Sequence, residues 1–335
     1  MSNSRRRWFQ QMHSLLVQPP LGHATHRYRL DTQWSQADPT RYPVNDCHEM
    51  VQVPDGRLFL LTNHPQNNIL IYNTAGKLLD AWTLNLKGAH GLTYHANHLY
   101  LTDTGTGQVL QTTLEGKVVL ALPHPAKAGA YTERDIYSPT ETAVAPNGDI
   151  YVADGYGSQY LLHYDKSGQY KNKFGGRSSQ PINKGKFLQA HGIALDTRGP
   201  QPLLVATARI RNEFHWFTLA GEYVRTVYLP GAYLSRPVLS GKYLYSAVCF
   251  GMFPDDYRMW QNRGFVVILD ENDKVISAPG AEPPAYKDGR LQLLLQSSPA
   301  AFRNPHDVCV DREQNLYVCQ WNSGKVYPYK LHREA

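Results

Sequence analysis

Four histidines occupy the same position in four copies of a repeated sequence pattern. Each stands at the first residue of a stretch that is expected to form the innermost strand of its repeat; they are His48, His90, His191 and His306. Imidazoles that meet at one point are typical ligands of a divalent transition metal, and zinc held by three of them keeps a position open for water or substrate. A single histidine at the start of a strand more often bonds a backbone carbonyl. The repetition favours a metal site, with three of the four histidines as ligands.

The strands that must bring these histidines together are clearest in residues 137–175, YSPTETAVAPNGDIYVADGYGSQYLLHYDKSGQYKNKFG. Apolar and polar residues alternate there in short runs, and Asn-Gly and Ser-Gly dipeptides separate neighbouring runs. Alternation with a period of two predicts strands, and these dipeptides supply the positive φ angles that tight hairpin turns need. The stretch therefore predicts a four-stranded antiparallel meander.

The same pattern recurs along the chain at intervals of about 40 to 50 residues. The six copies cover residues 48–82, 90–122, 137–175, 189–229, 236–278 and 304–331. Six such sheets around an axis form an all-β, six-bladed β-propeller, in which the inner strands begin at the mouth of a central channel. The last copy has only three strands, and residues 26–34, HRYRLDTQW, resemble the missing fourth. We expect this N-terminal strand to pair with the last blade and close the ring, which removes free sheet edges.

The length and the spacing of the repeats predict one domain. We assign residues 26–335 to a single propeller and residues 1–25 to a leader without a fold of its own. The longest interruption of the pattern, residues 249–304, is expected to lie over one face of the ring and to shape a pocket. Its predicted substrate contacts are Tyr257, Arg258, Trp260 and Arg263. The alternative for each of these side chains is packing on the top of the blade.

Charge and cysteine content bear on partners and compartment. The formal charge is +6 with a pI near 9.0, but Lys and Arg are scattered, so a solvated surface is expected rather than a nucleic-acid-binding face. Four cysteines without CxxC spacing predict buried thiols, in agreement with a cytoplasmic protein. Residues 4–9 resemble a twin-arginine export signal, but the segment that follows is too short and too polar for export. No apolar run is long enough to cross a membrane.

Several segments resemble the peptidyl-α-hydroxyglycine α-amidating lyase family, whose lyase domain is a propeller with six blades of the NHL-repeat type. Residues 145–175 are similar to the blade with the family's Asp-Gly-Tyr turn. The segments HGLTYHANHLYLTDTGTGQV, GKFLQAHGIALDTRG and NPHDVCVDREQNLYV are similar to the three blades that carry its zinc histidines. The resemblance implies that His90, His191 and His306 bind zinc or another divalent transition metal, with His48 as an additional imidazole.

The resemblance also assigns roles to residues beside the metal. Tyr156, in the Asp-Gly-Tyr turn, matches the family's catalytic tyrosine, and Arg209 matches a catalytic arginine. Asp307 matches the carboxylate of a structural calcium site, which main-chain oxygens of Leu92 and Met50 would complete. Tyr156 could instead pack between blades, and Asp307 could bond backbone amides.

The expected substrate pocket departs from the family's pattern. The family's second catalytic arginine would fall near Asn63, where this chain has no arginine, so Asn63 or His64 would fill the space and select a different substrate. Arg211 follows Arg209 by two residues and would point to the same side of a strand. Either arginine could therefore hold a substrate carboxylate.

These residues predict a metal-dependent lyase that acts at the channel mouth on a small-molecule or peptide-like substrate with a hydroxyl and an anionic group. The metal would acidify the hydroxyl, Tyr156 would handle the proton and Arg209 would hold the anion. A hydrolase or an isomerase on the same three-histidine centre is the alternative among enzymes. A non-catalytic NHL-type platform that binds a protein or RNA, with structural histidines, is the alternative from another class.

Overall fold

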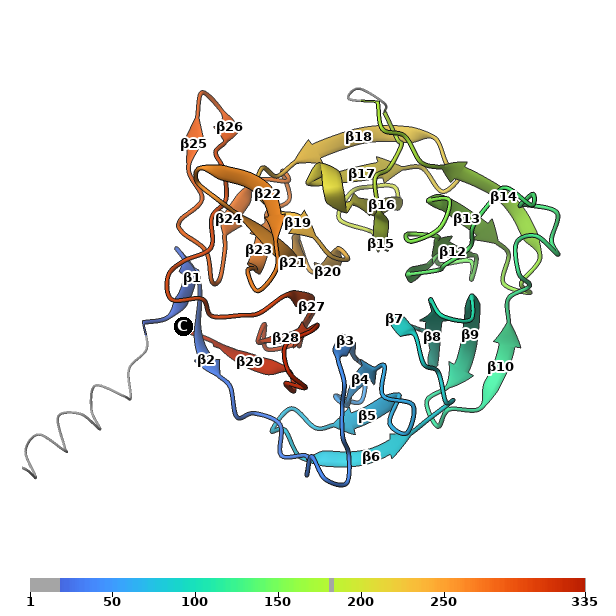
Figure 1. Cartoon of the computed structure of the whole chain (residues 1–335), viewed down its shortest axis with the longest axis horizontal. Coiled ribbons are helices and arrows are strands. Elements are labelled where there is room, and N and C mark those ends of the chain that lie inside the picture. The colour runs from blue at the N-terminus through green and yellow to red at the C-terminus, as the bar shows by residue number, and fades with distance from the viewer. Residues whose placement is uncertain (1–18, 181–183, 335) are drawn as a thin grey trace, which may run out of the picture.

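Six antiparallel sheets are arranged around a central axis, as the sequence predicts (Figure 1). The structure is a computed structural model that describes residues 19–180 and 184–334. In this part of the chain the one helix is a 3-10 turn, η1 (Arg209–Arg211), and no helix is long and apolar enough to span a membrane. Blades one to four each contain four consecutive strands. From the axis outward these are β3 (Cys47–Gln52), β4 (Leu58–Thr62), β5 (Ile69–Tyr72) and β6 (Leu78–Trp82); β7 (Ala89–His95), β8 (His98–Asp103), β9 (Gln108–Thr113) and β10 (Val118–Ala121); β11 (Glu141–Val144), β12 (Ile150–Ala153), β13 (Tyr160–Tyr164) and β14 (Tyr170–Gly175); β15 (Ala190–Asp196), β16 (Leu203–Ala208), β17 (Glu213–Phe217) and β18 (Tyr223–Tyr228).

Blade five contains a longer second strand than the other blades. Its strands are β20 (Val238–Ser240), β21 (Tyr243–Phe253), β23 (Phe265–Leu269) and β24 (Val275–Ser277). The far half of β21 pairs with two further strands, β19 (Tyr233–Leu234) and β22 (Asp256–Trp260). A separate hairpin, β25 (Tyr286–Lys287) and β26 (Arg290–Leu291), lies at the periphery (Figure 1). The segment 249–304 is therefore only partly an insertion, because it includes the two outer strands of blade five.

Blade six is closed by the N-terminal part of the chain, which confirms the predicted ring closure. Its strands are β27 (Pro305–Val310), β28 (Leu316–Gln320), β29 (Tyr329–Arg333), β2 (His26–Asp31) and β1 (Leu21–His23). In the β2–β29 ladder, Tyr28 lies opposite Arg333 and Asp31 lies opposite Lys330. The sheet begins at β1, earlier than the expected boundary at residue 26, because β1 forms a hairpin with β2. The predicted leader and export-like signal otherwise fall on residues 1–18, outside the described residues.

Apolar side chains fill every interface between neighbouring blades. Six hydrophobic clusters each join two adjacent blades, because alternate residues of a strand face the sheets on its two sides. Cys47, Cys309 and Cys319 belong to the cluster between blades six and one, and all four cysteines are buried and unpaired, as predicted. The packed blades hold the inner strands, and therefore their first residues, in fixed positions around the channel.

Candidate metal centre and active site

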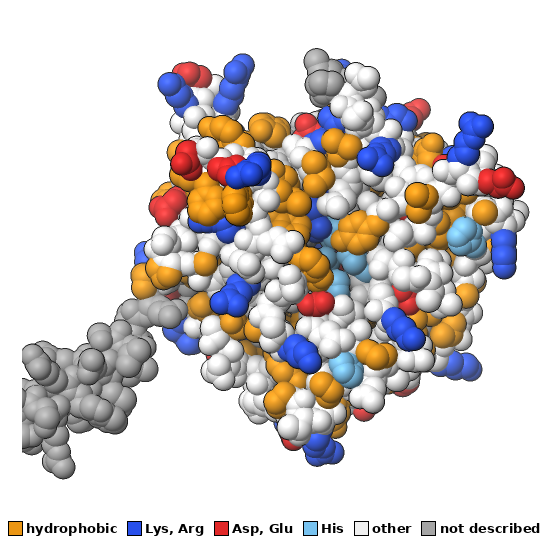
Figure 2. Space-filling model, viewed as in Figure 1, with side chains coloured by type: hydrophobic (Ala, Val, Ile, Leu, Met, Phe, Trp, Pro, Cys, Tyr) orange, Lys and Arg blue, Asp and Glu red, His pale blue; other side chains and the backbone are white. Residues whose placement is uncertain are grey.

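The second residues of four inner strands, one position later than predicted, bring imidazoles to the mouth of the channel. His48 lies on β3, His90 on β7, His191 on β15 and His306 on β27, and each residue is only 1–6 % exposed. Figure 2 shows histidine side chains at the centre of this face, in a hollow bordered by hydrophobic side chains. The register of the repeat therefore brings the four histidines together.

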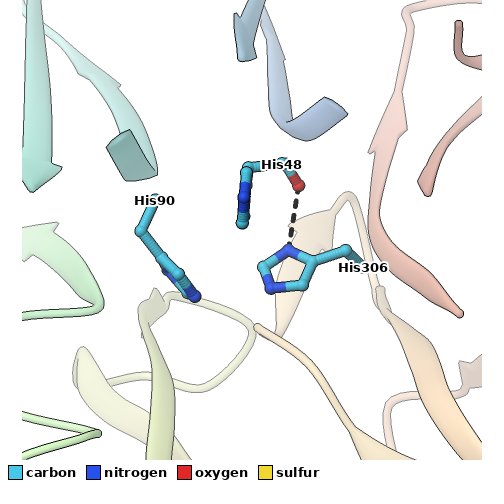
Figure 3. Close-up of side chains that lie close together, drawn as sticks. All are labelled: His48, His90 and His306. Carbon is cyan, nitrogen blue, oxygen red and sulfur yellow. Dashed lines mark hydrogen bonds between the residues drawn. The ribbon is translucent and has the colours of Figure 1, made fainter. Parts of the chain in front are cut away.

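Two of the four imidazoles are central to the cluster. The ring centre of His90 lies 5.0 Å from that of His48, 4.8 Å from that of His191 and 4.8 Å from that of His306. The ring centre of His306 lies 4.7 Å from that of His48 and 4.9 Å from that of His191. His48 and His191 flank this pair from opposite sides, because they come from blades one and four. One nitrogen from each of His48, His90 and His306 lies within 4.8 Å of the others (Figure 3).

Backbone carbonyls fix the protonation of the two central imidazoles. Nδ1 of His90 lies 2.9 Å from the carbonyl oxygen of Thr140, and Nδ1 of His306 lies 3.1 Å from that of His48 (Figure 3). A carbonyl oxygen can only accept, so Nδ1 carries the proton and Nε2 presents its lone pair. This is how metal-binding histidines are usually oriented. Nδ1 of His48 and Nδ1 of His191 are buried without a hydrogen-bond partner among the described residues.

Burial keeps the four imidazoles neutral. It lowers the pKa of His48 to about 4 and holds the pKa values of His90, His191 and His306 well below their ordinary value. The positive charge of Arg209 acts in the same direction on all four. A neutral imidazole is the form that binds metal, so this donor set fits a divalent transition metal such as zinc.

The hydroxyl of Tyr156 lies between two of the imidazoles. It is 3.0 Å from Nε2 of His90 and 3.0 Å from Nε2 of His191. Because Nε2 of His90 has no proton, the hydroxyl donates to His90 and accepts from His191. The side chain as a whole is 42 % exposed, but its hydroxyl is enclosed, and this burial raises the pKa of Tyr156 against the opposing charge of Arg209. Tyr156 is therefore protonated at neutral pH.

The turn that presents Tyr156 is held by the carboxylate of Asp154, which follows β12. Oδ1 of Asp154 accepts a hydrogen bond from the backbone N–H of Ser138 at 2.7 Å. Oδ2 accepts from the hydroxyl of Tyr131 at 2.7 Å and from the backbone N–H of Ser158 at 2.7 Å. Burial raises the pKa of Asp154 to about 6, although these donors oppose the shift. The Asp-Gly-Tyr turn is thus anchored on both sides of Tyr156.

Arg209 is a buried and fixed cation next to Tyr156. Its Nε donates to the carbonyl oxygen of Leu234 at 2.9 Å, and its Nη2 donates to Oγ of Ser235 at 3.1 Å. The positive charge of Arg209 acts to lower the pKa of Tyr156, and its guanidinium lies 5.7 Å from the ring centre of Phe250. A guanidinium held in this way is suited to bind a carboxylate with its remaining N–H groups.

Arg211 does not share the position of Arg209, and that prediction is wrong. The two residues lie in η1, a 3-10 turn, where side chains two positions apart point in different directions. The guanidinium of Arg211 instead donates from Nη2 to the carbonyl oxygens of Ser178 at 2.9 Å and Gln180 at 2.7 Å. It is not part of the cavity lining.

A cavity of about 380 Å³ opens over the histidines. Residues that follow the second strands of five blades contribute to its lining: Asn63, Thr104, Arg209 and Trp321 come directly after their strands, and Tyr156 comes three residues after the end of β12. The long β21 of blade five adds Cys249 and Phe250. Of the five residues after second strands, Asn63, Tyr156 and Arg209 were predicted from the sequence. The shared position after the second strand was the signal that could have identified Thr104 and Trp321.

The two polar residues predicted to replace the family's second arginine differ in position. Asn63 lines the cavity, but its side-chain amide is bonded to Asp46. Oδ1 of Asn63 accepts a hydrogen bond from the backbone N–H of Asp46 at 2.9 Å, and Nδ2 of Asn63 donates to Oδ2 of Asp46 at 2.9 Å. His64 lies outside the lining, where its Nδ1 accepts from the backbone N–H of Gln66 at 3.4 Å. Only Asn63 borders the predicted space.

The hairpin between β21 and β22 reaches the cavity through a residue that was not predicted. Met259 lines the cavity. The four predicted contacts lie outside the lining: Tyr257, Arg258, Trp260 and Arg263. Side chains alternate along a strand, so Arg258 and Trp260, the two neighbours of Met259, point away from the cavity. Tyr257, near the tip of the hairpin, is 67 % exposed.

The groups predicted to bind calcium surround an arginine side chain instead. Nε and Nη2 of Arg236 donate to the two carboxylate oxygens of Asp307 at 2.8 and 3.0 Å. Nη1 donates to the carbonyl oxygen of Leu92 at 2.8 Å, and Nη2 donates to that of Met50 at 2.9 Å. The guanidinium takes up the oxygens that calcium would need, so these residues do not fit a calcium ion.

Comparison with known proteins identifies distant relatives of the chain. No protein-family profile matches it. It is 25% identical over 266 residues to peptidyl-alpha-hydroxyglycine alpha-amidating lyase 1 of Drosophila melanogaster, covering 73% of this chain and 44% of that protein. It is 32% identical over 108 residues to a probable lyase of the same kind from Caenorhabditis elegans, covering 32% of this chain and 30% of that protein. The chain thus spans less than half the length of these lyase relatives. Human NHL repeat-containing protein 3 is 26% identical over 317 residues, covering 90% of this chain and 84% of that protein.

Solved structures share the fold at low sequence identity. A gluconolactonase from Xanthomonas campestris has a TM-score of 0.61 at 14% identity and covers 95% of both chains. A streptogramin B lyase has a TM-score of 0.56 at 12% identity, covering 92% of this chain and 98% of that one. These similarities establish the propeller. The sequence matches establish distant homology to amidating lyases and NHL-repeat proteins.

Proposed function

We propose that this distant relative of the amidating lyases is a metal-dependent lyase that acts on a small hydroxylated, anionic substrate. The observation that carries the proposal is the position of the Tyr156 hydroxyl, 3.0 Å from Nε2 of both His90 and His191, in a cavity that also contains Arg209. Metal-binding imidazoles, a proton-carrying group and an anion-binding group are the parts that such an elimination needs.

His90 and His306 would provide two of the metal ligands, because each of them contacts all the other imidazoles. His48 or His191 would provide a third. Their neutral state and the carbonyl-bonded Nδ1 of the central pair support this assignment. A divalent metal bound there supplies Lewis acidity that lowers the pKa of a coordinated hydroxyl.

Tyr156 would relay the proton of the reaction. Its raised pKa keeps the phenol protonated, so it can give its proton to the leaving nitrogen while it takes the proton of the substrate hydroxyl. The electron pair of the O–H bond then forms the carbonyl group as the C–N bond breaks. The products are a carbonyl compound and an amide or amine, and Tyr156 ends the cycle with its proton restored.

Arg209 would bind the anionic group of the substrate. Among the described residues that line the cavity, it is the single permanently charged side chain. Its bonds to Leu234 and Ser235 fix the guanidinium before a ligand arrives, which reduces the entropy cost of binding. Apolar side chains of Phe250, Met259 and Trp321 also border the cavity and would accommodate an acyl group. A compound with a carboxylate, a hydroxyl on the adjacent carbon and an N-acyl group would meet all of these features.

The test is an assay with N-benzoyl-α-hydroxyglycine, whose cleavage yields glyoxylate and benzamide. We expect the zinc-reconstituted protein to release both products in equal amounts, and the metal-free protein to release neither. The variant Tyr156→Phe should keep its zinc and lose activity about 100-fold or more. Tyr257→Phe is the matched control, because Tyr257 lies outside the cavity lining. Zinc-loaded protein that forms no glyoxylate from this substrate would contradict the proposal, and a water-dependent product from a related ester or lactone would favour a hydrolase.

A non-catalytic binding platform is the second candidate. It is favoured by the similarity to human NHL repeat-containing protein 3 over 90% of this chain. It is also favoured by exposed apolar side chains on β22, where Tyr257 is 67 %, Met259 42 % and Trp260 37 % exposed. On this hypothesis the purified protein contains no metal, and Tyr156→Phe has no effect, whereas Tyr257→Ser weakens binding of a partner.

A further inference from the structure

A second polar cluster lies in the channel, farther along the inner strands than the histidines. At its centre is Arg236, which is 8 % exposed and lies two residues before the start of β20. Besides its bonds to Asp307, Leu92 and Met50, its Nη1 lies 3.3 Å from Oε2 of Glu49 and 3.8 Å from Oε2 of Glu141. None of these four charged residues lines the cavity over the histidines, so the cluster is distinct from the site of the proposed function. An inference about the cluster does not depend on that proposal.

The groups around the guanidinium form an oxygen cage built by four blades. Its members are Glu49 and Met50 on β3, Leu92 on β7, Glu141 on β11 and Asp307 on β27. All three carboxyl groups are buried, at 0–1 % exposure. Oε2 of Glu141 has no hydrogen-bond partner among the described residues. Buried carboxylates are costly unless a cation or hydrogen-bond donors compensate them, and the guanidinium of Arg236 is the cation that lies within 4 Å of all three.

Blade four makes room for the arginine. A Cβ atom on Gly192 would lie 2.4 Å from Cα of Arg236 and 2.6 Å from its Cβ. Only a residue without a side chain can therefore stand beside Arg236. With the cage from four blades, the arginine from the start of blade five and the glycine from blade four, all six blades meet at this point.

We propose that Arg236 is a built-in cation that takes the place of a metal ion at the centre of the propeller. Carboxylates and backbone carbonyls are the ligands that calcium prefers, and five such residues surround the guanidinium. Unlike an ion, the guanidinium cannot dissociate, and its fixed N–H groups match the two oxygens of Asp307. The chain therefore holds its inner strands together without calcium, and removal of the Arg236 side chain converts the cage into a calcium site.

The experiment compares the full-length protein with two variants in 1 mM EDTA and in 1 mM CaCl2. The Tm of the wild-type chain should not change, and calorimetry should detect no calcium binding. Arg236→Ala should have a lower Tm in EDTA, bind one calcium ion and regain about 3 to 5 °C in calcium. Arg236→Lys is the matched control: it keeps a positive charge in the cage, so its Tm should not respond to calcium.

The source of any calcium response is tested by adding Asp307→Asn to the Arg236→Ala chain. This change removes a carboxylate from the cage and should abolish the response if calcium binds there. Should Arg236→Ala fail to fold in both buffers, Arg236→Gln, which preserves more of the side-chain volume, provides the same comparison. Calcium stabilisation of the wild-type chain, an equal response of the Ala and Lys variants, or no calcium binding by either neutral variant would each overturn the inference.

Discussion

At the scale of single residues, the four imidazoles are not equivalent. His90 and His306 each contact all the others and have Nδ1 bonded to a backbone carbonyl. His48 and His191 have no ring contact with each other among the described residues, and their Nδ1 atoms lack partners. His191 also bonds the Tyr156 hydroxyl through Nε2. A three-histidine centre that excludes His90 or His306 would have to join the two imidazoles that are farthest apart.

The first prediction follows from this asymmetry and concerns metal content. His90→Ala and His306→Ala should each abolish stoichiometric zinc after dialysis against a weak chelator, as measured by mass spectrometry of the metal. His48→Ala and His191→Ala should each retain zinc with affinity lowered by about 10- to 100-fold, because three imidazoles remain. His124→Ala, at an exposed position, is the control. Retention of full zinc by His90→Ala would refute the central role of that residue.

At the scale of elements, the Asp-Gly-Tyr turn connects the stability of blade three to the position of Tyr156. Asp154 accepts three hydrogen bonds at 2.7 Å from groups before and after the tyrosine. A Cβ atom on Gly157 would lie 2.2 Å from Oδ1 of Asp154 and 2.2 Å from the carbonyl oxygen of Ile136. The turn therefore depends on a glycine and a carboxylate that do not themselves line the cavity.

The second prediction is that Asp154→Asn displaces Tyr156 without removing the metal. The asparagine would direct an NH2 group at a hydrogen-bond donor, so at least one of the three bonds is lost, at a cost of about 1 to 3 kcal/mol. We expect kcat to fall about tenfold or more while zinc content is unchanged. Asp165→Asn is the matched control, because Asp165 holds an outer turn of the same blade through the backbone N–H groups of Ser167 and Gln169. Equal activity losses in both variants would indicate a general loss of stability rather than a displaced tyrosine.

The local elements explain what could be predicted from the sequence. The period of two and the turn dipeptides identified the blades, and the register of His48, His90, His191 and His306 within them was enough to predict that the imidazoles meet. The predicted direction of the Arg211 side chain was wrong because η1 interrupts the strand pattern at that point. The predicted cavity contacts on β22 were wrong because the pairing of β21 with β22 decides which side chains face the cavity. This pairing lies outside the repeated four-strand pattern, so the repeat does not indicate it.

At the scale of the whole molecule, long-range contacts account for what the sequence could not predict. Arginine side chains are usually exposed to solvent. Arg236 is buried because its guanidinium binds groups of Glu49, Leu92, Glu141 and Asp307, which belong to four other blades. No local pattern around residue 236 indicates those partners. Ring closure, in contrast, was predictable, because the last blade lacked a strand and residues 26–34 had the matching pattern.

The closing strand contains a histidine that couples ring closure to pH. His26, at the start of β2, is 4 % exposed, and its ring centre lies 4.7 Å from that of Tyr243 in blade five. Burial, followed by the charges of Arg333 and Lys242, lowers the pKa of His26 to about 4. In the unfolded chain the imidazole takes a proton near pH 6.5. Between these two values the unfolded state binds more protons than the folded ring, so this residue makes the free energy of unfolding decrease as the pH falls.

The third prediction is that replacing His26 by Phe removes this part of the pH dependence. Phenylalanine preserves an aromatic contact with Tyr243 but cannot be protonated. As the pH falls from 7 to 4.5, the free energy of unfolding of the variant should therefore increase relative to that of the wild-type chain. We expect a relative gain of about 1 to 2 kcal/mol in the free energy of unfolding, less than the full pKa shift would give, because water near the strand end screens part of the charge. Urea unfolding at several pH values measures it, and His124→Phe, at an exposed position, should show no such trend. If the difference between His26→Phe and the wild-type chain is constant over this range, protonation of the closing strand does not limit the acid stability of the ring.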